Sequence, residues 1–124
     1  MKKIILTVVV CSFSLLSVSA FSQRGSLVSK VRSTLVHDTY FGRCLALLER
    51  GINKGDNSPD CPSEWVSFSC DGTYNSKDIA YRKLDMAEKA EITQGNIIVY
   101  VDDTKKHNGH CYAYRVESLD SNSK

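Results

Sequence analysis

The stretch NIIVYVDDTKKHNGHCYAYRVESL, residues 96–119, decides which fold is predicted for this chain. Two runs rich in Val, Ile and Tyr, residues 96–107 and 110–119, flank the dipeptide Asn108-Gly109. Asn-Gly is a preferred two-residue turn of a β-hairpin, because both of its residues tolerate the positive φ that this turn needs. The sequence therefore predicts an antiparallel hairpin at the C-terminal end of the chain.

The side chains on either side of the turn also predict the register of this hairpin. Pairing the residues symmetrically about the turn places Val101 opposite Val116 and Asp102 opposite Arg115. Apolar partners and opposite charges both match in this register, and such cross-strand pairs stabilise antiparallel sheets. We therefore predict that the symmetric register holds along the whole hairpin.

One long helix is predicted before the hairpin, over residues 77–94. Asn75 and Ser76 are both suitable N-caps, and Asp78 lies in the first turn, where the helix dipole favours an acid. Gly95 is placed to end the helix. The apolar residues fall on one broad face, and they are Ile79, Ala80, Leu84, Met86, Ala87 and Ala90.

The residues before the helix predict further strands. Residues 64–70, EWVSFSC, alternate between two faces, as in a half-buried strand. Residues 26–36 and 40–50 are strand candidates too, although short helical turns stay open because periodicity cannot decide runs of this length. Residues 51–63 are rich in Gly, Asn, Asp and Pro and predict a loop. The predicted fold is therefore α+β, a small antiparallel β-barrel crossed by one long helix.

The N-terminus predicts export. A positive head at residues 2–3 precedes an apolar run at residues 4–16, and small residues follow at the expected cleavage site. The apolar run is shorter than the roughly 20 residues of a membrane-spanning helix, and no later stretch is long enough either. We predict a signal peptide at 1–20, a single mature domain at 21–124 with a frayed tail at 119–124, and a secreted or periplasmic location.

The charge balance argues against nucleic acid as a partner. The full chain has 16 Lys and Arg against 14 Asp and Glu. Loss of the signal peptide removes Lys2 and Lys3, so the predicted mature domain has no net charge. Nucleic-acid-binding domains usually carry a basic face, whereas the basic residues of this chain are interleaved with acidic ones.

Four cysteines remain in the predicted mature domain. An even number in a small exported domain predicts two disulfides, and the spacing lacks the C-x-x-C pairs of a zinc ribbon. A strand that packs back along the predicted helix returns the chain toward Cys70, and the tall hairpin places Cys111 at the same end. Among the three possible patterns, this geometry favours Cys70–Cys111 together with Cys44–Cys61.

Two groups of side chains are candidates for function. His107 and His110 flank the turn and could form an acid–base pair or a two-histidine metal site, or they could simply be solvated at a hairpin tip. Tyr100, Tyr112 and Tyr114 lie on adjacent predicted strands and could form a platform for a sugar or a peptide, or pack within the sheet. The chain has no nucleophile elbow, phosphate-binding glycine loop or H-E-x-x-H motif. These observations predict a protein that is not an enzyme and needs no metal or other cofactor.

Three segments carry a resemblance to a known family. They are residues 61–70, CPSEWVSFSC, residues 76–78, SKD, and residues 99–116, VYVDDTKKHNGHCYAYRV. Together they resemble a group of small exported bacterial proteins that is similar to the B subunits of subtilase cytotoxin-like AB5 toxins. The resemblance implies an oligomer-forming, five-stranded OB-like barrel that binds glycans. It implies no site residues, because the sialic-acid-binding residues of the toxin subunits have no counterpart in this sequence.

The sequence thus predicts a secreted, non-catalytic binding module with a glycan or protein ligand, which assembles with further copies of itself. Two other functions stay open at this point. One is a small secreted hydrolase or nuclease that uses His107 or His110. The other is a monomeric periplasmic inhibitor or envelope factor.

Overall fold

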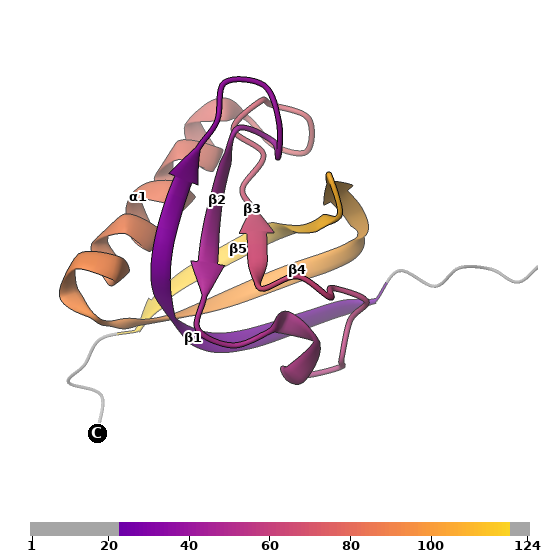
Figure 1. Cartoon of the computed structure of the whole chain (residues 1–124), viewed down its shortest axis with the longest axis vertical. Coiled ribbons are helices and arrows are strands. Elements are labelled where there is room, and N and C mark those ends of the chain that lie inside the picture. Colours follow the sequence, from indigo (N-terminus) through magenta and orange to yellow (C-terminus); the bar gives the residue numbers. More distant parts are fainter. Residues whose placement is uncertain (1–22, 120–124) are drawn as a thin grey trace, which may run out of the picture.

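The structure is a computed structural model and describes residues 23–119. In chain order it contains β1 (Arg24–Val36), β2 (Cys44–Leu48), the 3-10 helix η1 (Ile52–Lys54), β3 (Trp65–Ser67), α1 (Lys77–Thr93), β4 (Asn96–His107) and β5 (His110–Leu119) (Figure 1). The predicted α+β class with one long helix is confirmed. The predicted signal peptide and the tail beyond Leu119 lie outside the described residues. Between residues 23 and 119, no helix is both long enough and apolar enough to cross a membrane.

The five strands close into a ring in the order β1–β2–β3–β5–β4. The strand β1 is long and curved, so its first half pairs with β4 and its second half with β2 (Figure 1). All neighbours are antiparallel except β3 and β5, which meet through the parallel pair Ser67↔Tyr112. The prediction of a purely antiparallel sheet is wrong at this contact, because α1 carries the chain across the ring between β3 and β4.

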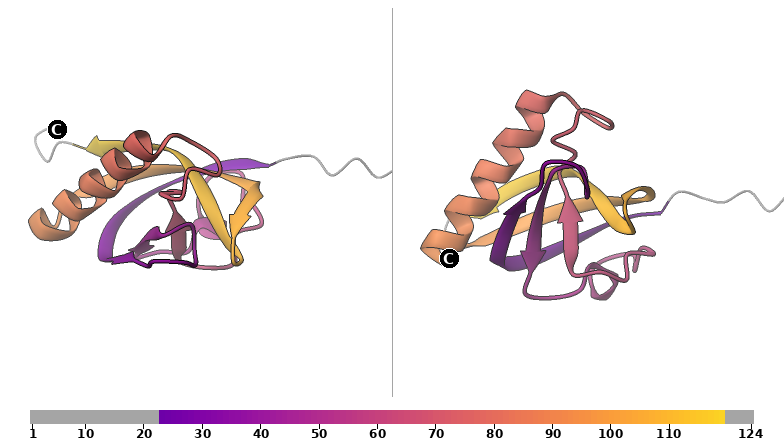
Figure 2. Two further views of the ribbon diagram at one scale, coloured as in Figure 1. Left: turned by 90° about the horizontal axis from the view of Figure 1, so that it is seen from above. Right: turned by 45° about the horizontal axis from the view of Figure 1, so that its top comes forward.

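The helix α1 lies across the ring and packs against β1 and β5 (Figure 2). Ser76 caps its first turn by accepting a hydrogen bond from the amide of Ile79, as predicted. The left-handed residue that ends the helix is Gln94 and not the predicted Gly95. The predicted apolar face is confirmed at Ala80, Leu84, Ala87 and Ala90. It is wrong for Ile79, which is exposed, because the buried stripe of the helix runs through Lys83 instead.

The register of the hairpin agrees with the prediction only next to the turn, where His107 pairs with His110. The predicted partners Asp102 and Arg115 are not opposite each other. The pairing shifts between Asp102 and Lys106, where β4 bulges toward the loop before β3, and it shifts again after Tyr100. The observed pairs are Val99↔Val116, Tyr100↔Arg115, Val101↔Ala113 and Asp102↔Tyr112.

All four cysteines of the described residues form disulfides, as predicted, but the predicted pairing is wrong. The bonds are Cys44–Cys70 and Cys61–Cys111. β2 and β3 pair antiparallel, so Cys44 at the start of β2 lies beside the segment that follows β3 and ends at Cys70. The loop before β3 carries Cys61 to the hairpin, where the amide of Asp60 donates a hydrogen bond to a β4 carboxylate.

Candidate functional site

Three segments that are far apart in the sequence meet at one end of the molecule (Figure 1). They are residues 37–43 between β1 and β2, residues 68–76 between β3 and α1, and the turn of the β4–β5 hairpin. His37 belongs to the first of these segments, and the other two histidines of the chain, His107 and His110, flank the hairpin turn. This end of the molecule therefore concentrates the groups that can recognise a ligand.

The β1–β2 loop contains three consecutive residues in the left-handed region. Phe41, Gly42 and Arg43 have φ values of 64°, 68° and 71°. Glycine adopts this conformation readily, whereas each non-glycine residue pays roughly 1–2 kcal/mol for it. Such conformations persist only where the surrounding structure holds them in place, and they cluster at ligand-binding and active sites.

Contacts from β3 and from the hairpin turn hold this loop. The amide of Phe41 donates a hydrogen bond of 2.8 Å to Oδ1 of Asn108, and Oγ of Ser67 donates one of 2.8 Å to the Phe41 carbonyl. Gly42 is required by close approach as well as by its φ. A Cβ at this position would lie 2.5 Å from Oγ of Ser67 and 2.6 Å from the ring of His107.

Beside this loop lies an open pocket of about 190 Å³, which we name the aromatic pocket. It is lined by Leu35, Phe41, Leu45, Trp65 and His110. It is on the outer side of the ring, because Leu45 alternates along β2 with residues that face the core. Ligand sites in proteins are mostly apolar concavities with a few placed polar groups, and the aromatic pocket has this character.

The polar group of the aromatic pocket is the imidazole of His110. Its Nδ1 lies 2.7 Å from Oγ of Ser63, and its ring centroid lies 5.5 Å from that of Phe41. Burial lowers the pKa of His110 below its ordinary value. Burial therefore favours the neutral imidazole, which offers a hydrogen bond without a charge.

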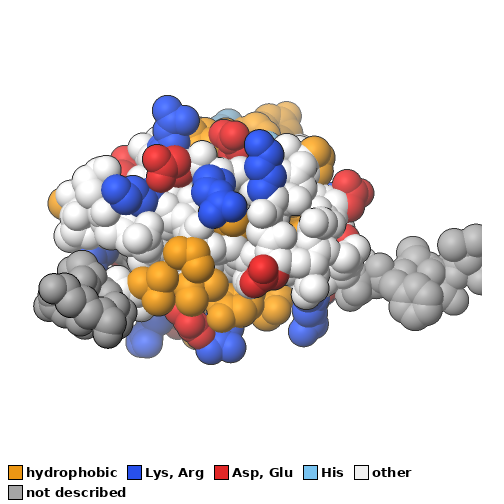
Figure 3. All heavy atoms as spheres, turned by 90° about the horizontal axis from the view of Figure 1, so that it is seen from below, with side chains coloured by type: hydrophobic (Ala, Val, Ile, Leu, Met, Phe, Trp, Pro, Cys, Tyr) orange, Lys and Arg blue, Asp and Glu red, His pale blue; other side chains and the backbone are white. Residues whose placement is uncertain are grey.

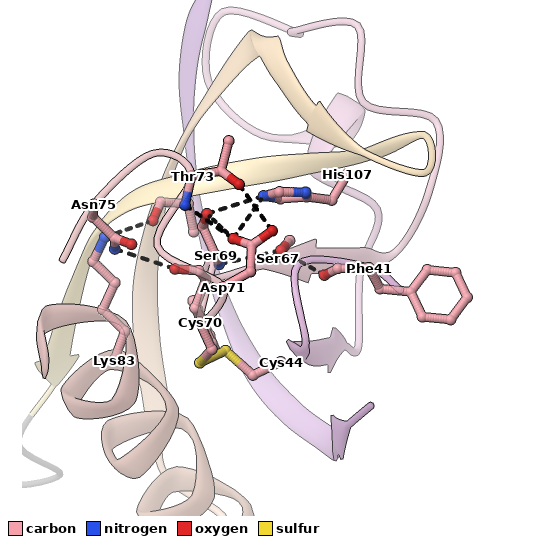
Figure 4. Close-up of a disulfide and its surroundings, with 12 residues drawn as sticks. Phe41, Cys44, Ser67, Ser69, Cys70, Asp71, Thr73, Asn75, Lys83 and His107 are labelled. Carbon is pink, nitrogen blue, oxygen red and sulfur yellow. Dashed lines mark hydrogen bonds and ion pairs between the residues drawn. A yellow bond between two sulfur atoms is a disulfide. The ribbon is translucent and has the colours of Figure 1, made fainter. Parts of the chain in front are cut away.

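His107 is not the solvated imidazole that one sequence interpretation expected. Only 12% of its side chain is exposed, and its ring lies 4.9 Å from the ring of Tyr74. Its Nε2 lies 3.0 Å from Oγ of Ser69 and 3.7 Å from Oδ1 of Asp71 (Figure 4). The imidazole is buried because the segment between β3 and α1 folds over the hairpin tip.

Ser69, Asp71 and His107 are residue types of a catalytic triad, but their geometry differs from one. In a triad the carboxylate and the serine contact different nitrogens of the imidazole, whereas here both lie near Nε2. Ser69 is 0% exposed, its hydroxyl donates to Asp71, and it accepts a hydrogen bond from the Tyr74 amide. Burial raises the pKa of Asp71, but hydrogen bonds from Thr73 and Ser69 outweigh it, so the pKa is lowered and the carboxylate stays ionised. The network anchors the hairpin tip.

The three tyrosines of the predicted platform do not form one surface, because Tyr112 lies apart from the other two. Tyr100 and Tyr114 lie together with ring centroids 6.2 Å apart. The guanidinium of Arg115 lies 4.9 Å from the centre of the Tyr100 ring, and that of Arg24 lies 4.8 Å from the Tyr114 ring. Tyr112 is only 4% exposed and packs toward α1.

Figure 3 views the molecule from below and shows hydrophobic side chains gathered on one part of that surface, with charged ones around them.

A buried lysine lies between the helix and β5 (Figure 4). Lys83 is 7% exposed, and its Nζ donates hydrogen bonds to the Tyr112 hydroxyl at 3.1 Å and to the Ala113 carbonyl at 2.9 Å. Burial lowers its pKa to about 8. This burial could not be predicted from the sequence, because a lysine within a helix is ordinarily solvent-exposed.

Most of the aromatic pocket could not be predicted from the sequence. The alternation of residues 64–70 assigned Trp65 to one face of a strand, which was a usable signal. Nothing local to Phe41 predicts that it joins this face, because the loop is placed by contacts with the distant turn at Asn108. Among residues 23–119, no three or more His, Cys, Asp or Glu side chains are grouped so that they could hold a metal ion.

Comparison of the chain with protein-family models, with curated proteins and with solved structures finds no match. The geometry of the site therefore carries the functional inference.

Proposed function

We propose that this protein is an exported, non-catalytic binding module that recognises a glycan in the aromatic pocket. The observation that carries the proposal is the left-handed Phe41, which is held by two hydrogen bonds and lines an apolar pocket with Trp65. Aromatic rings bind the apolar C–H face of a sugar ring, and the neutral imidazole of His110 supplies a hydrogen bond to a hydroxyl.

We propose further that the ring of strands is an OB-like fold. The strand order, the parallel contact between β3 and β5, and the position of α1 between β3 and β4 support this assignment. OB folds bind oligonucleotides and oligosaccharides on the face of strands 2 and 3, between the loops that follow strands 1 and 4. The aromatic pocket is lined by Leu45 of β2 and Trp65 of β3, and by Phe41 and His110 beside the loops after β1 and β4, which supports the assignment. The charge balance of the predicted mature domain favours a neutral glycan over a nucleic acid.

The two candidate histidines support binding over catalysis. The imidazole of His107 is engaged by Ser69 and Asp71, and that of His110 by Ser63. A general acid or base needs a nitrogen within reach of the reacting proton, and His107 is largely covered. The hydrolase alternative therefore rests on His110 alone.

Export and self-association complete the proposal. Two disulfides in so short a domain are typical of proteins that work in an oxidising compartment. The resemblance to AB5 B subunits supports assembly of several copies into one particle, which multiplies weak glycan contacts. Light scattering on the purified protein gives the number of subunits directly.

The test begins with a glycan array probed with the purified, disulfide-bonded protein. For the glycan with the strongest signal, Kd is then measured by calorimetry with the wild type and with Trp65→Ala. We expect Trp65→Ala to weaken binding at least about tenfold, or ~1.4 kcal/mol. Tyr100→Ala and Tyr114→Ala are the matched controls, because these rings do not line the aromatic pocket, and they should leave Kd unchanged.

Loss of binding in the Tyr100 and Tyr114 variants, with Trp65→Ala unaffected, would move the site to the tyrosine surface. If the wild type hydrolyses the bound glycan and His110→Gln does not, the protein is a hydrolase and not a non-catalytic binding module.

A further inference from the structure

We propose that Asn108 is a positioning residue for the aromatic pocket. Its side-chain oxygen holds the backbone of Phe41 in the left-handed conformation in which the ring lines the pocket. The proposal rests on the proposed function, because it assigns Asn108 a role in that same site. It goes beyond the turn-forming role that the Asn-Gly dipeptide already explains.

The turn itself does not need the Asn108 side chain. Asn108 has a φ of 51° and Gly109 one of 85°, which is the type of backbone that a two-residue hairpin turn requires. Asparagine, aspartate and glycine all adopt the first position of such a turn. The side-chain oxygen is therefore available for another contact, and it accepts the hydrogen bond from the Phe41 amide at 2.8 Å.

Phe41 needs such a contact because its conformation is unfavourable by itself. A bulky side chain in the left-handed region is strained, and Arg43, two residues further on, is strained in the same way. One net hydrogen bond is comparable in free energy to the strain at one residue. Losing the acceptor at Asn108 therefore lets the loop leave the binding conformation without unfolding the hairpin.

Among the contacts of the loop, the acceptor for the Phe41 amide is Asn108. Oγ of Ser67 donates to the carbonyl of Phe41 and does not reach its amide. The amide of Arg43 donates to the carbonyl of Tyr40, and the carbonyls of Gly42 and Arg43 accept from the amides of Asp71 and His37. None of these bonds reaches the amide of Phe41. Asn108 thus fixes the loop to the hairpin from the amide side, while β3 fixes it from the carbonyl side.

Three residues at the tip of the hairpin contact the β1–β2 loop. The ring of His107 lies against Gly42, so that a Cβ added to Gly42 would lie 2.6 Å from this ring. Asn108 accepts a hydrogen bond from the backbone amide of Phe41, and the imidazole centroid of His110 lies 5.5 Å from that of the Phe41 ring. Of these three residues, Asn108 is the one that hydrogen-bonds the strained backbone of Phe41, so it favours a pocket that is already formed before a glycan arrives. A preformed site binds more tightly, since less order is lost on binding.

Two variants separate this role from turn formation. Asn108→Gly keeps a residue that tolerates positive φ but removes the oxygen. Asn108→Asp keeps both an oxygen and a residue suited to this turn. Hydrogen–deuterium exchange of the Phe41 amide is measured in the free protein, with the β4 amides as an internal control. Binding is measured with the printed glycan array.

We expect Asn108→Gly to speed exchange of the Phe41 amide about five- to tenfold and to leave the β4 amides unchanged. The array signal should fall in Asn108→Gly and be retained in Asn108→Asp. Unchanged Phe41 exchange in Asn108→Gly would overturn the proposal, as would faster exchange with an undiminished array signal. If the wild type binds no glycan, the proposed function fails, and the exchange result alone decides whether Asn108 holds Phe41.

Discussion

The ring of Phe41 lies 5.5 Å from the ring of His110, which joins the loop after β1 to the turn between β4 and β5. The same loop is bonded to that turn through the amide of Phe41 and the side chain of Asn108. Trp65 closes the space beside them. The ligand site is therefore built from contacts between segments that are distant in sequence.

Replacing Phe41 separates backbone strain from ring contacts. Phe41→Ala and Phe41→Gly both remove the ring from the aromatic pocket, so both should weaken glycan binding. At a φ of 64° alanine is strained and glycine is not. We expect Phe41→Gly to be about 1 kcal/mol more stable than Phe41→Ala by urea denaturation. Tyr40→Ala is the control, since this neighbour is 56% exposed and does not line the pocket. Equal stability of the Phe41 variants would show that the left-handed backbone is not strained.

The two histidines of the hairpin should respond differently to substitution. His107→Ala leaves Ser69 and Asp71 without their partner in a largely covered network, so it should lower the free energy of unfolding by about 1–3 kcal/mol. His110→Ala should cost less stability and mainly weaken glycan binding. Chemical denaturation and calorimetry on the two proteins measure both quantities. Indistinguishable unfolding free energies for the wild type and His107→Ala would contradict the anchoring role.

Lys83 should make stability depend on pH in the alkaline range. Its pKa is about 8 in the folded protein because of burial, whereas an unfolded lysine titrates near about 10.4. Between these values the unfolded chain binds more protons, so the free energy of unfolding rises as the pH increases. We expect a gain of about 2 kcal/mol between about pH 7.5 and about pH 9.5, measured by urea denaturation. Lys83→Met should lack this gain, and parallel pH profiles for the two proteins would refute the assignment.

The disulfide pattern is tested by peptide mapping under non-reducing conditions. We expect peptides that join Cys44 to Cys70 and Cys61 to Cys111. Replacing Cys44 and Cys70 together with alanine should lower stability by about 2–5 kcal/mol, because the closed loop in the unfolded chain is lost. A peptide that joins Cys70 to Cys111 would mean that the loop before β3 takes a different path.

Features encoded by neighbouring residues could be predicted from the sequence. The turn at Asn108 and the capped helix start at Ser76 depend on local backbone preferences, and both are confirmed. The hairpin register could not be predicted, because Asp103 in the bulge of β4 accepts hydrogen bonds from the amides of Gln23 and Asp60, which are distant in sequence.

The candidate site was harder to predict than the fold. Trp65 appeared in an alternating run, but the left-handed Phe41 has no signature in its neighbours and depends on Asn108 across the molecule. The cysteine pairing failed for a similar reason, since the long loop carries Cys61 to the hairpin. The burial of Lys83 could not be predicted, because it depends on the packing of α1 against β5.

Glycan binding in the aromatic pocket defines the function proposed for this protein. The most direct measurement is a titration of the isotope-labelled protein with the strongest glycan from the array, followed by two-dimensional NMR. We predict that the largest shifts occur at the indole N–H of Trp65, at the amide of Phe41 and at the ring of His110. Shifts centred on Tyr100 and Tyr114, with those three signals unmoved, would show that the glycan does not bind in the aromatic pocket.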